Sequence, residues 1–422
     1  MPVVAVLRRS NPLIKQLTAS STLILIAFTS LVLLVGSASA QTFTVRYAFN
    51  GGQDGSLSQP YANLALDAAG NLYGTTSGFS CLRGCNDAPG AIFRLSSLGK
   101  LTVVHTLNCE TAGCSPLGGL VGDSGGNVYG TTQNGDFTWG TVYQVNATTY
   151  ETLHAFNHTD GSAPASDLLR DAVGNLYGTA PSGGDLNSGV AFEISSAGEF
   201  NVLHRFSGGL DGSFPSGGLV MDAQGNLYGT TGGGGGSGCL GQLGCGTVYK
   251  IDTSGQETVL YSFAGGTDGS APNGDLLLDK SGNLYGTTAG GGGSGCQGNG
   301  CGTVFKVDKN GVETVLYRFK GGNDAANPGA GLVTDGAGNL YGTTVRGGAK
   351  DFGTVFGLRP NGKEVILHRF TGGTDGANPV AKLLRDSHGT LYGTTRSGGN
   401  VQCPYAIEFV PGCGVVFSIS LP

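Results

Sequence analysis

The chain has 422 residues, of which 79 are glycine, and only 12% are charged. Its formal net charge is −6, and beyond residue 40 it carries 20 basic against 29 acidic residues, because residues 1–40 hold three basic and no acidic side chains. Nucleic acid and anionic membranes require a basic footprint, so neither is expected as a main partner.

Residues 1–40 are predicted to be a secretory signal peptide. Arg8, Arg9 and Lys15 form a positive start, a mostly apolar run follows over 23–35, and the small residues 38–40 precede the expected cleavage site. An uncleaved membrane anchor is the alternative, but an apolar run of this length is shorter than the ~20 residues of a spanning helix. We expect a secreted protein, extracellular or periplasmic, with no membrane attachment after cleavage.

One seven-residue phrase, Gly-Asn-Leu-Tyr-Gly-Thr-Thr, organises residues 41–422. It returns seven times with small changes, at spacings of 48 to 57 residues. A period in this range is typical of repeat architectures, and it fits the four-stranded blade of a β-propeller. The tyrosines of the seven copies are Tyr73, Tyr129, Tyr177, Tyr228, Tyr285, Tyr341 and Tyr392.

Each repeat predicts four short strands, named a to d in chain order. In one well-defined repeat, residues 275–279 form strand a, 283–288 strand b, 302–308 strand c and 313–319 strand d. Apolar residues alternate along strands c and d, as in half-buried strands. An Asp-x-x-Gly-Asn turn joins a to b, and turn formation explains its Asp and Gly without a metal.

The two chain ends predict that the repeats close into a ring. Residues 44–49 match strand d, while residues 414–420, at the end of the chain, match strand c. The seventh repeat therefore lacks its own strand d, and the N-terminal strand supplies it, which leaves no open sheet edge. We expect a single domain over 41–422, an all-β, seven-bladed β-propeller of four-stranded blades.

The combination of these motifs resembles known repeat families. Asp-x-x-Gly-Asn-Leu-Tyr followed by Gly-Thr-Val-Phe resembles NHL-type propeller repeats. With Thr-Val-Leu-Tyr-x-Phe and Gly-Gly-x-Asp-Gly-x-x-Pro added, the whole mature chain is similar to bacterial GloVer tandem-repeat proteins. The resemblance implies an extracellular protein, often with C-terminal anchoring or sorting signals, and it supplies no catalytic residues. The sequence ends directly after strand c, so secretion without an anchor is our expectation.

Ten cysteines fall into five local pairs. With a secretory signal, such pairs predict five short-range disulfides. Metal thiolates are the alternative, weakened because each pair lies in a different repeat. Four pairs lie in b–c loops and one in a d–a loop, on the face where variable loops on a rigid scaffold usually bind. The pairs are Cys81/Cys85, Cys109/Cys114, Cys239/Cys245, Cys296/Cys301 and Cys403/Cys413.

An aspartate recurs in six of the seven d–a loops. One hypothesis is a ring of carboxylates near the axial channel that binds a sugar or a cation such as Ca²⁺. The alternative is that Asp-Gly is simply a turn former, in which case no cofactor is needed. Both remain open from the sequence. The residues are Asp54, Asp160, Asp211, Asp268, Asp324 and Asp375.

Three further residues of the b–c loops, Trp139, Arg346 and Arg396, are candidates to line a glycan or peptide site. Histidines argue against catalysis, because four of the six share one place in strand d of different repeats and cannot converge.

We therefore expect a monomeric, non-catalytic binding module for a glycan or protein, acting through disulfide-stapled loops on one face. The alternative is an extracellular propeller enzyme of lyase, lactonase or hydrolase type, with acidic residues at the channel mouth. A purely structural surface protein is a third class.

Overall fold

The computed structural model describes residues 41–51, 59–77, 90–110, 113–135, 139–236, 238–239, 244–400, 406–407 and 410–422. The predicted signal peptide lies outside these residues. The described residues form β-strands and turns and no helix, so none offers an apolar helix that could cross a membrane.

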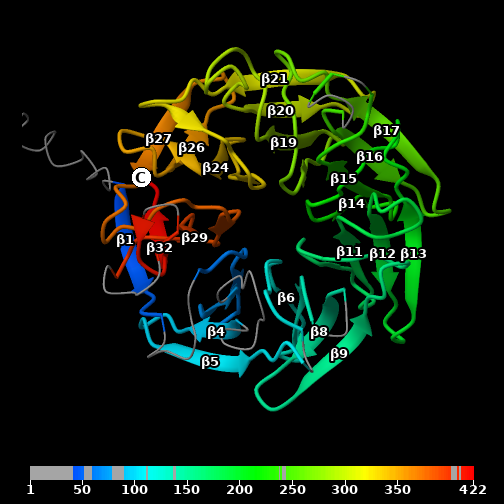
Figure 1. Ribbon diagram of the computed structural model, residues 1–422. Coiled ribbons are helices and arrows are strands. Elements are labelled where there is room, and N and C mark those ends of the chain that lie inside the picture. Colours follow the sequence, from blue (N-terminus) through cyan, green and yellow to red (C-terminus); the bar gives the residue numbers. More distant parts are fainter. Residues whose placement is uncertain are drawn as a thin grey trace, which may run out of the picture. The chain divides into compact units, whose positions relative to one another are not determined.

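Seven four-stranded antiparallel sheets surround a central axis and form the predicted seven-bladed β-propeller (Figure 1). In each sheet the strands follow the order a, b, c, d. Blade 1 is β2 (Ala65–Leu66), β3 (Leu72–Thr76), β4 (Ala91–Leu95) and β5 (Leu101–Thr106); blade 2 is β6 (Val121–Gly122), β7 (Val128–Thr132), β8 (Thr141–Val145) and β9 (Tyr150–Ala155); blade 3 is β10 (Leu169–Arg170), β11 (Leu176–Ala180), β12 (Val190–Ile194) and β13 (Phe200–Arg205); blade 4 is β14 (Val220–Met221), β15 (Leu227–Thr231), β16 (Thr247–Ile251) and β17 (Glu257–Ser262); blade 5 is β18 (Leu277–Leu278), β19 (Leu284–Thr288), β20 (Thr303–Val307) and β21 (Glu313–Arg318); blade 6 is β23 (Val333–Thr334), β24 (Leu340–Thr344), β26 (Thr354–Leu358) and β27 (Glu364–Arg369).

Blade 7 closes the ring as the chain ends predict. Its sheet has the order β1 (Thr42–Ala48), β32 (Val415–Ser420), β29 (Leu391–Thr395) and β28 (Leu384–Arg385). The N-terminal strand β1 runs antiparallel to β32, from Thr42 opposite Ser420 to Ala48 opposite Val415. It gives the last blade an outer strand and so covers the edge of β32 that would otherwise be open.

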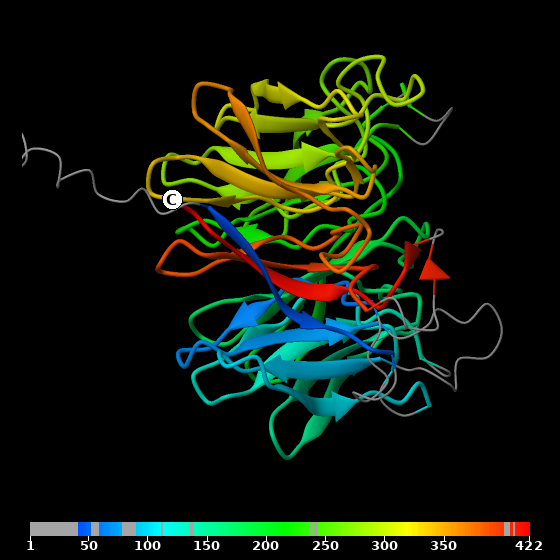
Figure 2. The same ribbon diagram turned by 90° about the vertical axis from the view of Figure 1, so that its left-hand side faces the viewer.

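The two faces of the ring differ, as the side view in Figure 2 shows. On one face, which we call the plain face, the turns are short: five residues join β2 to β3 and again β4 to β5. On the other face, which we call the loop face, the connections are long and carry two extra two-stranded sheets, β22 (Ala325–Ala326) with β25 (Arg346–Gly347) and β30 (Ala406–Ile407) with β31 (Val410–Pro411).

The repeated Asp, Asn and Tyr form one hydrogen-bonded unit on the plain face. In blade 1, Asp67 Oδ1 accepts the main-chain N–H groups of Ala69 and Asn71, at 3.0 and 2.8 Å. Its Oδ2 accepts Asn71 Nδ2 at 2.7 Å and the Tyr73 hydroxyl at 3.4 Å. The same aspartate–tyrosine bond recurs in the other six blades, so these residues serve the turn and hold strand b to it.

The second glycine of the phrase lets strand c pack closely on strand b, and its first threonine binds strand b to the next blade. A Cβ on Gly74 would lie 2.6 Å from Phe93 Cζ, so the glycine makes room for the buried aromatic ring of strand c. The hydroxyl of Thr287 donates to the carbonyl oxygen of Ala330 in the next blade, at 2.9 Å. Equivalent bonds from Thr179 and Thr343 fix the innermost segments of the blades that follow them.

A proline leads into every strand a, and the residue before it lies in the left-handed region. In blade 5 this residue is Ala271, with φ 52°, and its N–H donates to Cys245 O of the preceding blade at 2.9 Å. Pro272 packs on Gly246, where a Cβ would lie 2.6 Å from its Cδ. A left-handed conformation costs free energy in residues other than glycine. Its recurrence in all seven blades therefore indicates that this joint fixes the position of each blade's inner segment. The seven residues are Gln59, Ser115, Ala163, Phe214, Ala271, Asn327 and Asn378.

At the outer rim, a residue at the start of strand d packs on the preceding blade. Phe200 stacks on His154 at 3.6 Å, and Phe43 stacks on His368 at 3.7 Å. Three blades carry a glutamate at this position instead, and in each the buried Oε1 has no hydrogen-bond partner among the described residues. Burial, and then the charge of a nearby loop aspartate, raise the pKa of these side chains to about 7. They are Glu257, Glu313 and Glu364.

Candidate functional site

The recurring d–a loop aspartates lie beside strand d rather than around the axis. Asp268 Oδ2 accepts the Tyr261 hydroxyl at 3.0 Å and the N–H of Ala264 at 2.8 Å. Asp375 Oδ2 lies 3.0 Å from His368 Nε2 and accepts the N–H of Thr371 at 3.0 Å. Each carboxylate thus closes its own loop onto the outer strand.

The other described members of this set, Asp160, Asp211 and Asp324, make the same kind of contact. None of the five lines the axial cavity described below, so their position differs from the predicted axial ring. Asp54 lies outside the described residues. Within the described part of the chain, no three His, Cys, Asp or Glu side chains gather as a metal site would require, and a role for these aspartates in ligand binding stays a prediction.

Each of the two described disulfides closes a b–c loop and lies against the d–a loop that follows in the same blade. Cys239–Cys245 and Cys296–Cys301 are both bonded, as predicted from their spacing. In blade 5, a Cβ on Gly321 of the d–a loop would lie 3.0 Å from Cys296 Sγ, so the disulfide and this loop are in close contact.

The remaining cysteines are described only in part. Cys413 is disulfide-bonded, while Cys81, Cys85 and Cys403 lie outside the described residues. Cys109 and Cys114 are buried on the loop face, and a bond between them stays a prediction.

The other candidate residues come from b–c loops of three different blades and do not form one site. Trp139 in blade 2 is 54% exposed and meets the ring of His158 edge-on at 4.7 Å. Arg346 in blade 6 is exposed and forms a long ion pair with Asp351, at 3.9 Å. Arg396 in blade 7 lies over the ring of Tyr61, with Cζ 5.2 Å from the ring centroid.

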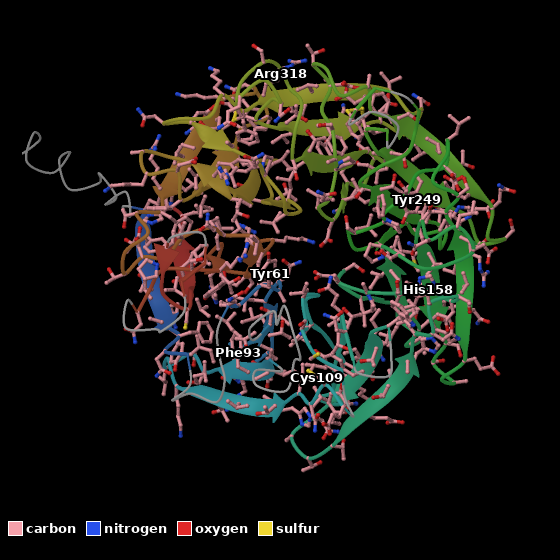
Figure 3. All side chains as sticks on the ribbon, viewed as in Figure 1. Tyr61, Phe93, Cys109, His158, Tyr249 and Arg318 are labelled. Carbon is pink, nitrogen blue, oxygen red and sulfur yellow. A yellow bond between two sulfur atoms is a disulfide. The ribbon has the colours of Figure 1, made fainter. Side chains whose placement is uncertain are left out.

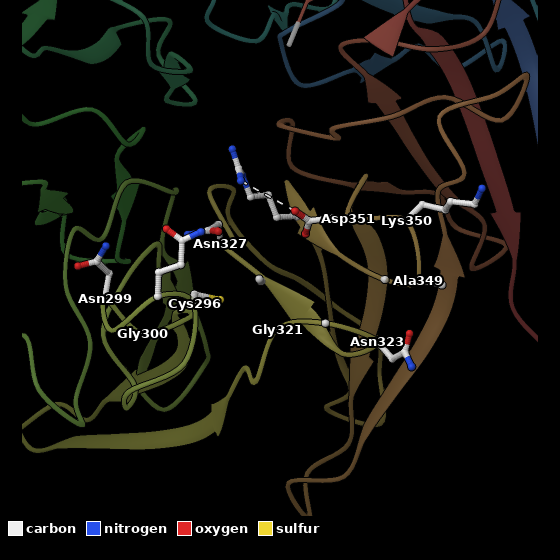
Figure 4. A pocket seen from close by; sticks show the side chains of 14 residues that line it. Cys296, Asn299, Gly300, Gly321, Asn323, Asn327, Ala349, Lys350 and Asp351 are labelled. Atoms are coloured by element: carbon white, nitrogen blue, oxygen red, sulfur yellow. Dashed lines mark ion pairs between the residues drawn. The ribbon is translucent and has the colours of Figure 1, made fainter. Parts of the chain in front are cut away.

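A groove of about 1040 Å³ opens on the loop face between blades 5 and 6 (Figure 4). One wall is the disulfide-bonded loop of blade 5 at 296–300, and the other is the loop of blade 6 at 346–351. The d–a loop at 321–327 also contributes to the lining. Amide and charged side chains dominate the lining: Asn299, Asn323, Asn327, Arg346, Lys350 and Asp351.

A second cavity, of about 180 Å³, lies on the axis, and all seven blades contribute to it. Tyr61 marks its place beside the central opening in Figure 3. The seven innermost positions are each the third residue after the repeat's proline. They are Asn63, Gly119, Asp167, Gly218, Asp275, Gly331 and Lys382.

The four polar members of this ring, Asn63, Asp167, Asp275 and Lys382, are joined across the axis, and we call them the axial cluster. Asn63 Nδ2 donates to Asp167 Oδ2 at 2.5 Å, while its Oδ1 accepts the main-chain N–H of Lys382 at 2.5 Å. Lys382 Nζ donates to Asp275 Oδ2 at 3.2 Å.

The three glycines of the ring make the axial cluster feasible. Gly119 N–H donates to Asp167 Oδ1 at 2.6 Å, and Gly218 N–H donates to Asp275 Oδ1 at 2.7 Å. A Cβ on Gly331 would lie 3.1 Å from Lys382 Cδ. Glycine at these positions therefore supplies both the donors and the space that the charged side chains need.

The electrostatics of the axial cluster follow from its confinement. Burial raises the pKa of Asp167 most strongly, and the charge of Asp275 adds to this, so that the pKa lies at about 6 despite the opposing Lys382. Burial lowers the pKa of Lys382, but the two carboxylates outweigh it and hold that pKa above its ordinary value. Lys382 is thus an ammonium at neutral pH, whereas the raised pKa of Asp167 lies close to neutral pH.

Sequence inspection missed the axial cluster, although one signal for it was present. When the seven copies are aligned on their proline, the third residue after it is the one inner position that varies between charge, amide and glycine. The sequence instead predicts axial carboxylates in the Asp-Gly turn that precedes the proline, where the regular repetition reflects a structural role.

These observations define the protein as a disulfide-bonded, seven-bladed β-propeller with an open loop face and a polar axis. The model of the Gloeobacter/Verrucomicrobia repeat matches residues 80–298 and 294–421, so the chain belongs to this family. No curated protein matches the sequence.

Solved structures share the fold at low sequence identity. The extracellular domain of a protein described as a hybrid two-component system, BT4673 from B. thetaiotaomicron, is 11% identical over 89% of this chain, with a TM-score of 0.57. A second structure, described as the extracellular domain of a one-component system BT4673, gives 11% identity over 90% and a TM-score of 0.56. This chain spans 39% of the length of either. A protein described as a gluconolactonase is 13% identical over 90% of this chain and 92% of its own, with a TM-score of 0.43.

Proposed function

We propose that the protein is a secreted, extracellular binding protein that holds a glycan in the groove between blades 5 and 6. The predicted signal peptide and the disulfides support export to an oxidising compartment. The chain is expected to act as a monomer without a cofactor. The groove is the observation that carries the proposal, because it is large, open and walled by a covalently fixed loop.

The Cys296–Cys301 disulfide bears on affinity as well as on stability. It links two cysteines five positions apart in the loop that forms one wall of the groove. A loop that is already ordered does not lose its conformational freedom when a ligand binds, so more of the contact free energy becomes affinity.

The lining chemistry favours a glycan over a protein partner. Asn299, Asn323 and Asn327 offer amide groups that both donate and accept, which suits hydroxyl groups. Arg346 and Lys350 add donors at the rim. Protein hot spots usually need an aromatic or large apolar anchor in a pocket, and the described lining of this groove offers only alanine, glycine and the disulfide as apolar surface.

The enzyme alternative would have to use the axial cluster. Its two carboxylates, Asp167 and Asp275, are the only pair near the axis among the described residues. Both oxygens of each already accept an internal hydrogen bond, and the neighbouring lysine is protonated, so it cannot act as the base. Binding therefore fits this geometry better than hydrolysis or elimination.

A glycan-array screen of the mature protein tests the proposal. We expect a defined glycan class to bind the wild type and to lose at least tenfold in affinity in the double variant Asn323→Ala with Lys350→Ala. Both side chains are exposed, so the fold should be unaffected. The matched control is Lys309→Ala with Asn310→Ala in an exposed turn of the plain face, which should bind as the wild type does. Equal binding by both double variants, or capture of proteins without any glycan, would overturn the proposal.

A further inference from the structure

The axial cavity offers hydrogen-bonding groups that the axial cluster does not use internally. Lys382 has three N–H donors and, within the described residues, donates one of them, to Asp275. A carboxylate can accept about four hydrogen bonds, and Asp167 accepts two. Tyr61, Ser216 and Asn273 add a hydroxyl or amide each around the same cavity.

Donors and acceptors therefore face one small space that holds two carboxylates and one ammonium. A ligand anion would face two carboxylates, and a ligand cation would face the ammonium of Lys382. A hydroxyl group donates to a carboxylate and accepts from an ammonium at the same time. From this arrangement we infer that the axial cavity is a second binding site, which takes one neutral sugar ring.

The volume sets the size of the ligand. About 180 Å³ corresponds to the space of roughly six waters at ~30 Å³ each, which is enough for one sugar ring but not for a chain. Free monosaccharides and the terminal unit of a glycan share this chemistry. The groove between blades 5 and 6 has no lining residue in common with the axial cavity, so the inference does not depend on the function proposed for the groove.

A purely structural role does not explain the axial cluster. Three of the seven blades carry glycine at the same position and keep the same inner joint. Buried ion pairs are costly to desolvate and are often replaceable by apolar residues without loss of stability. Four polar side chains at a position that tolerates glycine, aimed into one cavity, are expected where a ligand takes up their remaining hydrogen bonds.

The test is a titration followed by calorimetry and by thermal shift. The probes are glucose, galactose, mannose, xylose and N-acetylglucosamine, with glucuronate and glucosamine as charged counterparts. At least one neutral sugar should bind and raise the melting temperature, while its acidic and basic counterparts should bind at least tenfold more weakly. Comparing the free sugar with its methyl α- and β-glycosides distinguishes a free monosaccharide from a chain terminus.

A blocking variant assigns the binding to the axis. Gly329 lines the cavity mouth, and a Cβ there meets only Val345 Cγ2 at 3.8 Å, so Gly329→Leu should fold and reduce binding at least tenfold. The matched control is Gly336→Leu, in an exposed plain-face turn of the same blade with open space around it. Lys382→Met should also abolish binding, and Asn323→Ala with Lys350→Ala should leave it unchanged. The inference is wrong if no neutral sugar binds, if the charged sugars bind equally well, or if Gly329→Leu binds as tightly as Gly336→Leu.

Discussion

Two sets of aspartates in this molecule have opposite environments. Each a–b turn of the plain face holds one aspartate, and in five of these turns its pKa lies below the ordinary value: burial would raise it, but hydrogen bonds from Asn, Tyr and main-chain N–H groups prevail. On the axis, the pKa of Asp167 is raised to about 6, because burial and Asp275 outweigh its hydrogen bonds. The first set follows the repeat, and the second interrupts it.

The comparison separates residues that hold the fold from residues available for function. The aspartate of each a–b turn uses its carboxylate oxygens to accept hydrogen bonds within that turn and strand b. Asp167 and Asp275 lie instead among partners from other blades, such as Asn63 and Lys382, and keep acceptors directed into a cavity. In a repeat protein, the position that departs from its own repeat is therefore the better guide to a binding site.

The largest expected effect comes from removing the strand that closes the ring. Deleting residues 41–50 removes β1 and exposes the edge of β32. We expect aggregation and a melting temperature lower by roughly 10 °C or more, since each kcal/mol lost shifts a large domain by a few degrees. Light scattering and calorimetry measure this, with the chain starting at residue 41 as the control. A monomeric deletion variant with unchanged melting would show that the ring does not close through β1.

A smaller loss is expected when the groove's disulfide is removed. Replacing Cys296 and Cys301 by serine should cost about 2 kcal/mol of unfolding free energy, the closure entropy of so short a loop. It should also weaken glycan binding in the groove. The matched control, serine at Cys239 and Cys245, should lose similar stability in denaturant titrations but keep the binding. Equal binding losses in both variants would mean that the staple in blade 5 has no special role.

The rim glutamates predict a pH dependence of stability. The pKa of Glu313 is raised to about 7 in the folded protein. Protonated Glu313 therefore favours the folded state at low pH, and this contribution to stability is fully present below about pH 4.5. It disappears as the pH rises through about 7. Glu313→Gln should remove that part of the pH dependence and exceed the wild type by about 1 kcal/mol at pH 8, after allowance for partial solvent exposure. Glu151→Gln, on an exposed rim site of blade 2, is the control in urea titrations at pH 4 to 8. A variant that keeps the wild-type pH profile would contradict the assignment.

The smallest effect should come from one bond of the repeated turn. Tyr341→Phe removes the hydroxyl that donates to Asp335 Oδ2 at 3.0 Å and should cost about 1 kcal/mol at pH 7. Because hydrogen bonds hold the pKa of Asp335 below its ordinary value, the benefit is present above the unfolded-state pKa and declines as the pH falls through the folded-state pKa. The difference between variant and wild type should therefore shrink toward pH 2. Sugar binding should be unchanged, and a loss of it would place function in the turn.

The fold could be predicted because its signals are local and repeated. Each copy of the phrase specifies a turn and strand b, and the matching chain ends specify closure. The sequence predicts strand a over 275–279, but the strand is shorter, Leu277–Leu278, because only these two residues pair with strand b, opposite Tyr285 and Leu284. The disulfides at Cys239–Cys245 and Cys296–Cys301 could be predicted from their local pairing together with the secretory signal.

The axial cluster could not be read from local pattern. Asn63 and Lys382 are 319 residues apart and meet only after the ring has closed. Their pairing also requires glycine at Gly119, Gly218 and Gly331, which in a chain this rich in glycine is not distinctive. Repeated Asp-Gly loops gave a stronger sequence signal, although their carboxylates bond to their own loops and strands.

The most direct test of the separation between repeated and irregular positions is an amide chemical-shift map of the ¹⁵N-labelled protein titrated with a neutral sugar that binds. The amides of Gly119 and Gly218 donate to Asp167 and Asp275 and should shift strongly. The turn glycines Gly282 and Gly338 should not move. Shifts spread evenly over the seven plain-face turns, with Gly119 and Gly218 unperturbed, would contradict the assignment of binding to the positions that break the repeat.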